Sequence, residues 1–104
     1  MNMNIEAKSL EGRKKLRLKI LKKLYELNFK DDKNSTGLKI MDITKLKEKE
    51  MLAYAYLEAR EFIESKNAGV GKRSYKITIY GIDKIQFLSI NYDRYKGKSN
   101  NISY

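Results

Sequence analysis

The 104-residue chain contains no cysteine, no histidine, no proline and no tryptophan. Without cysteine it has no disulfide and no thiol nucleophile, and without histidine it has neither a Cys/His zinc site nor a triad with a histidine base. No window of about 18 residues is apolar and uncharged, so no segment is predicted to span a membrane. The length fits one domain with one modest core.

An apolar leader is also missing. Residues 1–15 hold no continuous apolar run, so no secretory signal is predicted and we expect a cytoplasmic protein. The acidic residues form no facing pair that general acid-base catalysis would need. Gly69 and Gly71 are not followed by the Lys-Ser/Thr pair of a phosphate-binding loop. We therefore expect no enzymatic activity, no metal site and no cofactor.

Positive charge is in excess. The chain has 23 Lys and Arg against 13 Asp and Glu, a formal net charge of +10. Lysine is abundant together with Ile, Asn and Tyr, whose codons are AT-rich, so part of this excess need not reflect function. Lysines of that origin would only keep the protein soluble, whereas a polyanionic partner requires them on one surface.

The hydrophobic pattern predicts a single folded domain over residues 9–90. Residues 1–8 are predicted to form a flexible leader. Residues 91–104 are rich in Asn, Ser and Lys and are predicted to form a disordered tail.

Within the domain, apolar spacing predicts a helix from Ser9 to about Asn28, followed by a polar loop over 30–37. A second helix is predicted over 47–64, because this stretch lacks Gly and Pro and has acidic residues near its start. Residues 38–46 fit neither the helical nor the strand period, so a short strand and a short helix both remain open.

A β-hairpin is predicted next. Residues 65–73 carry two glycines and a basic cluster between two apolar runs. Tyr75, Ile77 and Ile79 alternate with polar residues, as in a half-buried strand. Thr78 is placed to cap a last helix. The predicted fold class is α+β, mostly helical, with one core.

Three segments resemble the winged helix-turn-helix DNA-binding domains of small prokaryotic proteins. Residues 20–28 (ILKKLYELN) resemble their opening helix, and residues 56–64 (YLEAREFIE) resemble the junction between the recognition helix and the wing. Residues 76–83 (KITIYGID) resemble the segment that closes the wing and opens the last helix. The chain departs from the common pattern at Glu61, where the wing-entry glycine is expected, and residues 38–46 lack a clear turn glycine.

The resemblance implies a winged helix, which is a three-helix core with a two-stranded β wing and a C-terminal helix. It also implies that the third helix enters a major groove of double-stranded DNA while the wing contacts phosphates or a neighbouring minor groove. Because such proteins are commonly dimeric, it also implies a homodimer. The function expected on this basis is that of a small transcriptional regulator.

Three basic segments provide candidate DNA contacts. The run from Arg13 to Lys23 holds seven positive charges and no acid. The charged residues over 65–82 are also all positive. A solvated lysine face and an ordinary flexible hairpin tip are the alternatives for these two segments. The candidate contacts are Arg13, Lys14 and Arg17 in the first helix, Lys45, Lys47, Lys49 and Tyr56 around the reading helix, and Lys66, Lys72, Arg73 and Lys76 in the wing.

The presumed reading helix opposes this interpretation. Residues 42–64 contain four positive and six negative side chains, a net charge of 4 − 6 = −2. This acidic balance favours an alternative, in which the winged helix binds a protein partner through the apolar run at 51–57 (MLAYAYL) and the lysines only solubilise. Most of that apolar run is nevertheless expected to lie in the core.

Overall fold

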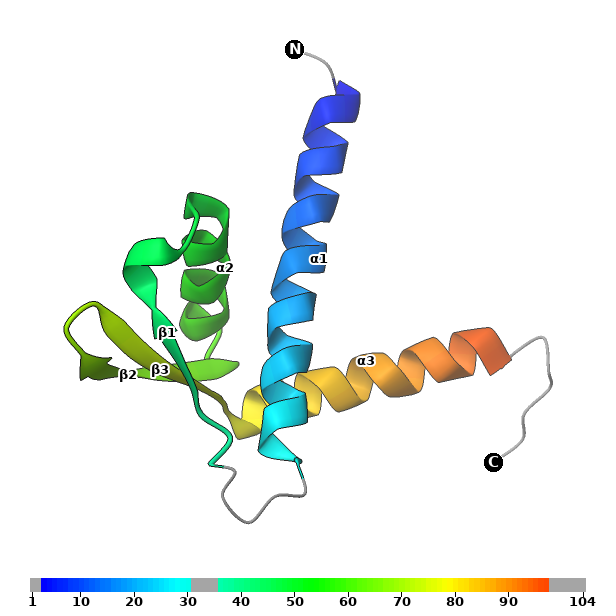
Figure 1. The fold of residues 1–104 in the computed structure, drawn as a ribbon. Helices are drawn as coiled ribbons and strands as arrows, with labels where there is room; N and C mark the ends of the chain where they lie inside the picture. The colour runs from blue at the N-terminus through cyan, green and yellow to red at the C-terminus, as the bar shows by residue number, and fades with distance from the viewer. Residues whose placement is uncertain (1–2, 31–35, 98–104) are drawn as a thin grey trace.

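The computed structural model describes the backbone of residues 3–30 and 36–97, with side chains over 10–30 and 36–90. The described fold is α+β and mostly helical, with three α-helices and a three-stranded antiparallel sheet in the order β1-β3-β2 (Figure 1). The elements are α1 (Met3–Asn28), β1 (Lys39–Asp42), a 3-10 turn η1 (Ile43–Lys45), α2 (Glu48–Ala59), β2 (Ile63–Gly69), β3 (Lys72–Ile77) and α3 (Ile79–Gly97).

The sheet and the helices differ from the expected three-helix core with a two-stranded wing and a C-terminal helix. Where a second core helix is expected, the described chain forms strand β1 and the single turn η1. Asp42 accounts for the turn, because its carboxylate accepts hydrogen bonds from the backbone N–H and the hydroxyl of Thr44. The backbone N–H of Ile43 donates to the carbonyl of Gly71 at 2.9 Å, which ties this turn to the hairpin.

The outer helices are longer than expected. Helix α1 begins at Met3 instead of Ser9, and α3 continues to Gly97. The described parts of the expected leader (1–8) and tail (91–104) are therefore helical, and the remainder of both lies outside the described residues.

Helix α2 ends at Ala59, although a helix was predicted as far as residue 64. It ends there because Glu61 adopts a left-handed backbone conformation with φ of 63°. The backbone N–H of Phe62 then donates back to the carbonyl of Leu57 at 2.9 Å, and β2 starts at Ile63.

Strands β2 and β3 form the predicted hairpin, but the strands reach further into the glycine-rich segment than expected. Ile63 pairs with Ile77 and Asn67 with Arg73, and a register shift follows between Asn67 and Gly69. Because Gly69 and Gly71 both have positive φ, the reversal is confined to the tip of the hairpin. Most of the predicted 65–73 loop is therefore strand.

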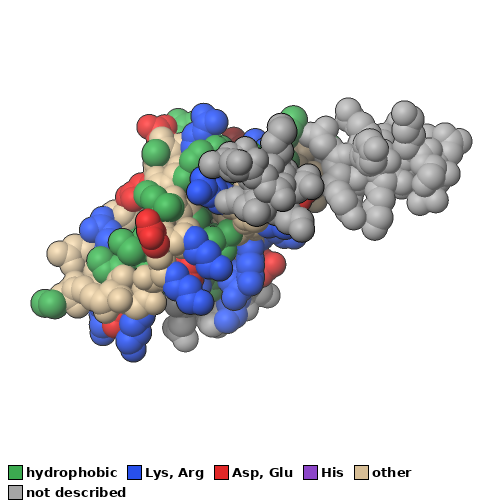
Figure 2. Space-filling view, turned by 90° about the horizontal axis from the view of Figure 1, so that it is seen from above, with side chains coloured by type: hydrophobic (Ala, Val, Ile, Leu, Met, Phe, Trp, Pro, Cys, Tyr) green, Lys and Arg blue, Asp and Glu red, His purple; other side chains and the backbone are tan. Residues whose placement is uncertain are grey.

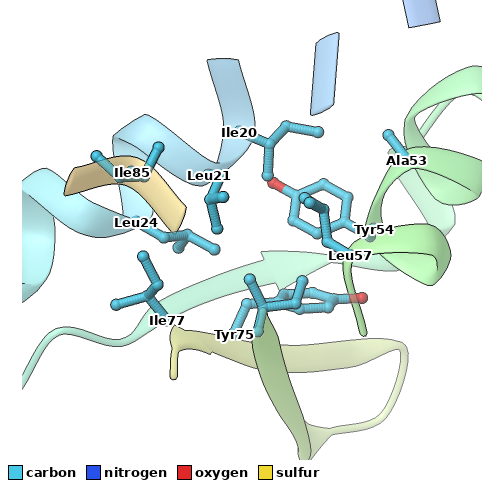
Figure 3. Packing of buried hydrophobic residues seen from close by; sticks show 10 residues of the cluster. Ile20, Leu21, Leu24, Ala53, Tyr54, Leu57, Tyr75, Ile77 and Ile85 are labelled. Atoms are coloured by element: carbon cyan, nitrogen blue, oxygen red, sulfur yellow. The ribbon is translucent and has the colours of Figure 1, made fainter. Parts of the chain in front are cut away.

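The core lies where α1, α2, α3 and the centre of the sheet meet (Figure 3). Leu24 has no exposed surface, and the rings of Tyr54 and Tyr75 pack with their centroids 4.5 Å apart. Burial raises the pKa of Tyr54 to about 12. The buried apolar residues are Ile20, Leu21, Leu24, Ala53, Tyr54, Leu57, Ile63, Tyr75, Ile77 and Ile85.

The apolar run at 51–57 is mostly exposed, which corrects the expectation that most of it is core. Ala53, Tyr54 and Leu57 are buried, whereas Met51 and Leu52 remain 51% and 58% exposed. A 12-residue helix that packs on one side of α1 buries only that side, so the opposite side of the run faces outward.

Candidate nucleic-acid interface

The densest positive charge lies along α1. Its seven basic residues between positions 13 and 23 are all exposed except Arg17, which is half-buried, and no acid interrupts them. Figure 2, viewed from above α1, shows Lys and Arg side chains gathered beside this helix, with hydrophobic side chains between them. These seven residues are Arg13, Lys14, Lys15, Arg17, Lys19, Lys22 and Lys23.

The three lysines of the hairpin lie on one face of the sheet. Side chains alternate along a strand, and Tyr75 and Ile77 of β3 point into the core, so Lys72 and Lys76 belong to the opposite face. Lys66 pairs with Ser74 and shares that outer face. This outer face is the side of the sheet opposite the core, and it is therefore turned away from α1.

Two carboxylates share the outer face with these lysines. Asp42 pairs with Lys72 across β1 and β3, and Glu64 pairs with Lys76 across β2 and β3. The pKa of Asp42 is lowered by its hydrogen bonds from Thr44. Three lysines and two carboxylates make the outer face only weakly positive, so the hairpin holds less net charge than its sequence indicates.

Arg73 lies on the inner face of the hairpin. It is half-buried, and its Nη2 and Nε atoms donate to the hydroxyl of Ser65 at 2.8 and 3.2 Å. That hydroxyl donates in turn to a carboxylate oxygen of Glu58 on α2. Arg73 therefore joins the hairpin to α2 and does not project from the tip toward a phosphate or a minor groove, as its place among the candidate DNA contacts requires.

The lysines expected at the reading helix gather at its start. Lys45 lies in η1, Lys47 is the residue that precedes α2, and Lys49 is in the first turn, and all three are exposed. The backbone N–H of Lys47 donates to Oε1 of Glu50 at 3.2 Å, which caps the helix.

Beyond its first turn, the exposed surface of α2 is apolar and acidic. Met51, Leu52 and Ala55 are exposed there, together with Glu58, whereas Glu48 and Lys49 are exposed in the first turn. Phosphates and base edges in a major groove are read mainly by Arg, Lys, Asn and Gln. This face of α2 therefore lacks the side chains that direct reading of a DNA sequence needs.

Tyr56 joins the basic run of α1 to the end of α2. The Arg17 guanidinium lies over its ring, with Cζ 3.8 Å from the centroid, and Nε of Arg60 donates to the phenol oxygen at 3.3 Å. The pKa of Tyr56 is lowered first by this hydrogen bond and then by the positive charges of Arg60 and Arg17. One phenol thus holds two guanidinium groups on one surface.

Two grooves flank the contact between Arg17 and Tyr56. The first groove, of about 470 Å³, lies between α1 and α2 and brings together the predicted residues Arg13, Arg17, Lys49 and Tyr56. The second groove, which we call the three-helix groove, has a volume of about 330 Å³ and lies between α1, α2 and α3. It is lined by four basic residues, Lys14, Arg17, Arg60 and Lys84, and by six apolar or aromatic residues, Leu18, Leu21, Tyr56, Leu57, Phe62 and Leu88.

Arg60 and Lys84 are basic residues of this surface that were not among the predicted contacts. Tyr56 and Arg60 are four residues apart, the spacing at which side chains meet on a helix, so their contact has a sequence signal. Lys84 has none, because α3 meets α1 only in the folded chain. The wing lysines, in contrast, are not brought to this surface.

Comparison with known proteins adds no relative: no family model, no curated protein and no solved structure matches this chain significantly. Over the described residues, no three acidic side chains come together as a metal site. None of the described helices combines the length and the apolar character needed to cross a bilayer. Function is therefore inferred from the residues themselves.

Proposed function

We propose that this protein binds double-stranded DNA through the basic residues of α1 that lie beside α2 and α3, Arg13, Lys14 and Arg17, as a small transcriptional regulator. The observation that carries the proposal is the unbroken series of seven exposed or half-exposed cations on that helix. Each phosphate that they neutralise releases counterions, which favours association with a polyanion. The Arg17–Tyr56–Arg60 cluster extends this basic surface onto α2.

The layout of the chain supports the winged-helix resemblance behind this proposal. A hairpin follows α2 and leads into a last helix. Glu61 adopts the left-handed conformation at the position where the common winged-helix pattern has the wing-entry glycine. Lys66 and Lys72 on the outer face of the hairpin are then a secondary contact to the phosphate backbone. Because the exposed face of α2 is apolar and acidic, we propose backbone contacts with little sequence preference.

Charge reversal on α1 tests this proposal. The double variant Arg13→Glu/Lys14→Glu is compared with Lys30→Glu/Lys39→Glu, which removes the same charge near the other end of α1 and at β1. Each pair changes the net charge from +10 by 2 × (−2) to +6. Binding to a mixed-sequence duplex is followed by fluorescence anisotropy between about 50 and 200 mM salt.

We expect the Arg13/Lys14 variant to bind at least about tenfold more weakly, with a salt slope reduced by about 2, because two phosphate contacts are lost. The Lys30/Lys39 variant should keep the original slope. Equal loss in both variants would mean that only the overall charge matters, and would remove α1 as the site.

A protein partner is the second candidate, and one observation favours it. Met51 and Leu52 are more than half exposed on α2, and Leu52 borders the groove that also holds Lys49 and Arg13. An exposed apolar surface of this kind is suited to a partner that presents an apolar segment. Absence of duplex binding at the low-salt end would leave this candidate as the leading one.

A further inference from the structure

We propose that the three-helix groove binds a small amphiphilic anion, meaning a carboxylate or sulfonate attached to an aromatic or aliphatic body. The groove has both an apolar interior and a rim of one charge. Its volume of about 330 Å³ is at the lower end of the range for small-molecule sites. Ligand binding here does not rest on the DNA-binding proposal.

The apolar part of the groove is built from all three helices and the start of the hairpin. Leu21 and Leu57 are each only 2% exposed and form its floor. Leu18 is 39% exposed at the edge, while Phe62 and Leu88 are half-buried. An aromatic ring or a short alkyl chain lying on this floor removes apolar surface from water on both sides.

The charged part of the groove is entirely positive. Lys14, Arg17, Arg60 and Lys84 line it, and no acidic residue does. Arg17 and Arg60 are both held against Tyr56, so two guanidinium groups are kept near one another. A bound anion relieves their mutual repulsion. It also accepts hydrogen bonds from the guanidinium groups, whose planar N–H donors match the geometry of a carboxylate.

The apolar floor and the positive rim of the groove together favour a small amphiphile over the DNA backbone. A phosphodiester chain presents no apolar group to the leucines of the floor, whereas an aliphatic cation is repelled by the rim. If the DNA-binding proposal also holds, such a ligand competes with the duplex, because Lys14 and Arg17 belong to both surfaces. The groove is then a site at which a small molecule weakens DNA binding.

The test uses the full-length protein and the fluorescent aromatic anion anilinonaphthalene sulfonate. We expect a saturable fluorescence increase that decanoate reverses and that decyltrimethylammonium, a cation of similar chain length, does not. Arg60→Gln and, separately, Lys84→Gln should weaken binding about five- to tenfold, because each removes a charge-assisted contact. Lys84→Gln leaves the cluster around Tyr56 intact, so it separates loss of charge from loss of that arrangement.

Two matched controls locate the site. Lys30→Gln removes the same charge outside the groove, and Met51→Gln removes an exposed apolar side chain of α2 that lines neither groove; both should change binding by less than about twofold. Circular dichroism verifies the fold of each variant. Equal effects of Lys84→Gln and Lys30→Gln, a loss in Met51→Gln, or equal displacement by both amphiphiles would overturn the proposal. Duplex binding is measured separately, so its failure does not bear on this result.

Discussion

The guanidinium carbon of Arg17 lies 3.8 Å from the centre of the Tyr56 ring and so links the middle of α1 to α2. Arg60 approaches the same residue from the end of α2 and donates a hydrogen bond to its phenol oxygen. The two arginines share one aromatic partner, and the basic surface of α1 continues to Arg60 at the end of α2. The cluster also separates the two grooves between these helices.

The first prediction concerns the ionisation of Tyr56. Its pKa is lowered by the Arg60 hydrogen bond and the two nearby positive charges, which stabilise the phenolate. Replacing Tyr56 by Phe should therefore remove absorbance change from the early, lower-pH part of the tyrosinate titration. Arg60→Gln should move the same change to higher pH. If Tyr56→Phe instead removed absorbance change from the high-pH part of the curve, the stabilisation of the phenolate by Arg60 and Arg17 would be contradicted.

Tyr54 should make stability fall at alkaline pH. Its pKa is about 12 in the folded chain, raised from 10.0 by burial and, to a smaller extent, by Tyr75 and Glu50. The neutral phenol therefore contributes stability that is complete below pH 10, and this contribution is lost as pH rises toward 12. Urea unfolding between those limits should show the stability of the wild type approaching that of Tyr54→Phe. Parallel profiles for the two proteins would show that the buried phenol is not responsible.

Glu61→Gly should stabilise the fold. Glu61 has a φ of 63°, which an L-residue with a side chain adopts at a cost of roughly 1–2 kcal/mol and glycine adopts freely. After the entropy that glycine adds to the unfolded chain, we expect a gain of up to about 1 kcal/mol in the free energy of unfolding. Glu64→Gly, in strand β2, removes the same charge and should instead lose about 0.5–1 kcal/mol. The idea fails if both variants are destabilised alike in urea titrations.

Gly81→Ala should be strongly destabilising, whereas Gly12→Ala should stabilise. A Cβ at Gly81 would collide with the carbonyl oxygen of Phe62 and lie 2.6 Å from Cγ1 of Ile77. That carbonyl accepts a hydrogen bond from the backbone of Thr78 at 3.0 Å, so it is not free to move away. We expect a loss of at least about 2 kcal/mol.

Gly12 provides the matched control, because nothing lies within 4 Å of a Cβ at this helical position. Alanine there should add about 0.5–1 kcal/mol through its higher helix propensity. Thermal unfolding of both variants checks the pair. Comparable stability of Gly81→Ala and the wild type would mean that α3 does not pack this closely on the hairpin entry.

The elements that sequence reasoning predicted well depend on local patterns. The apolar spacing through Ile20 and Leu24 predicted α1, and the alternation at Tyr75 and Ile77 predicted β3. Strand β1 had no comparable signal, since its pairing partners lie 30 to 36 residues away in β3 and its own pattern fits no period. The short turn η1 is capped by the side chain of Asp42 through its bonds with Thr44, a local interaction that composition does not reveal.

The candidate site likewise has one part that the sequence predicts and another that only the packing of the helices creates. The basic run of α1 is visible in the sequence because its charges lie within eleven residues with no acid between them, whereas the meeting of Arg17, Tyr56 and Lys84 requires three helices to pack. One error was avoidable. Arg73 has the same strand parity as the inward-facing Tyr75, so the alternation already placed it on the inner face of the hairpin.

The most direct test of DNA binding by α1 is the affinity of the unmodified protein for a mixed-sequence duplex, measured by fluorescence anisotropy from about 50 to 200 mM salt. With four to six phosphate contacts, the logarithm of the association constant should fall linearly against the logarithm of salt concentration, with a slope of about −4 to −5. A second duplex of unrelated sequence should give a similar line, because α2 offers few side chains for reading bases. No binding at the low-salt end by a protein with a net charge of +10 would contradict the account.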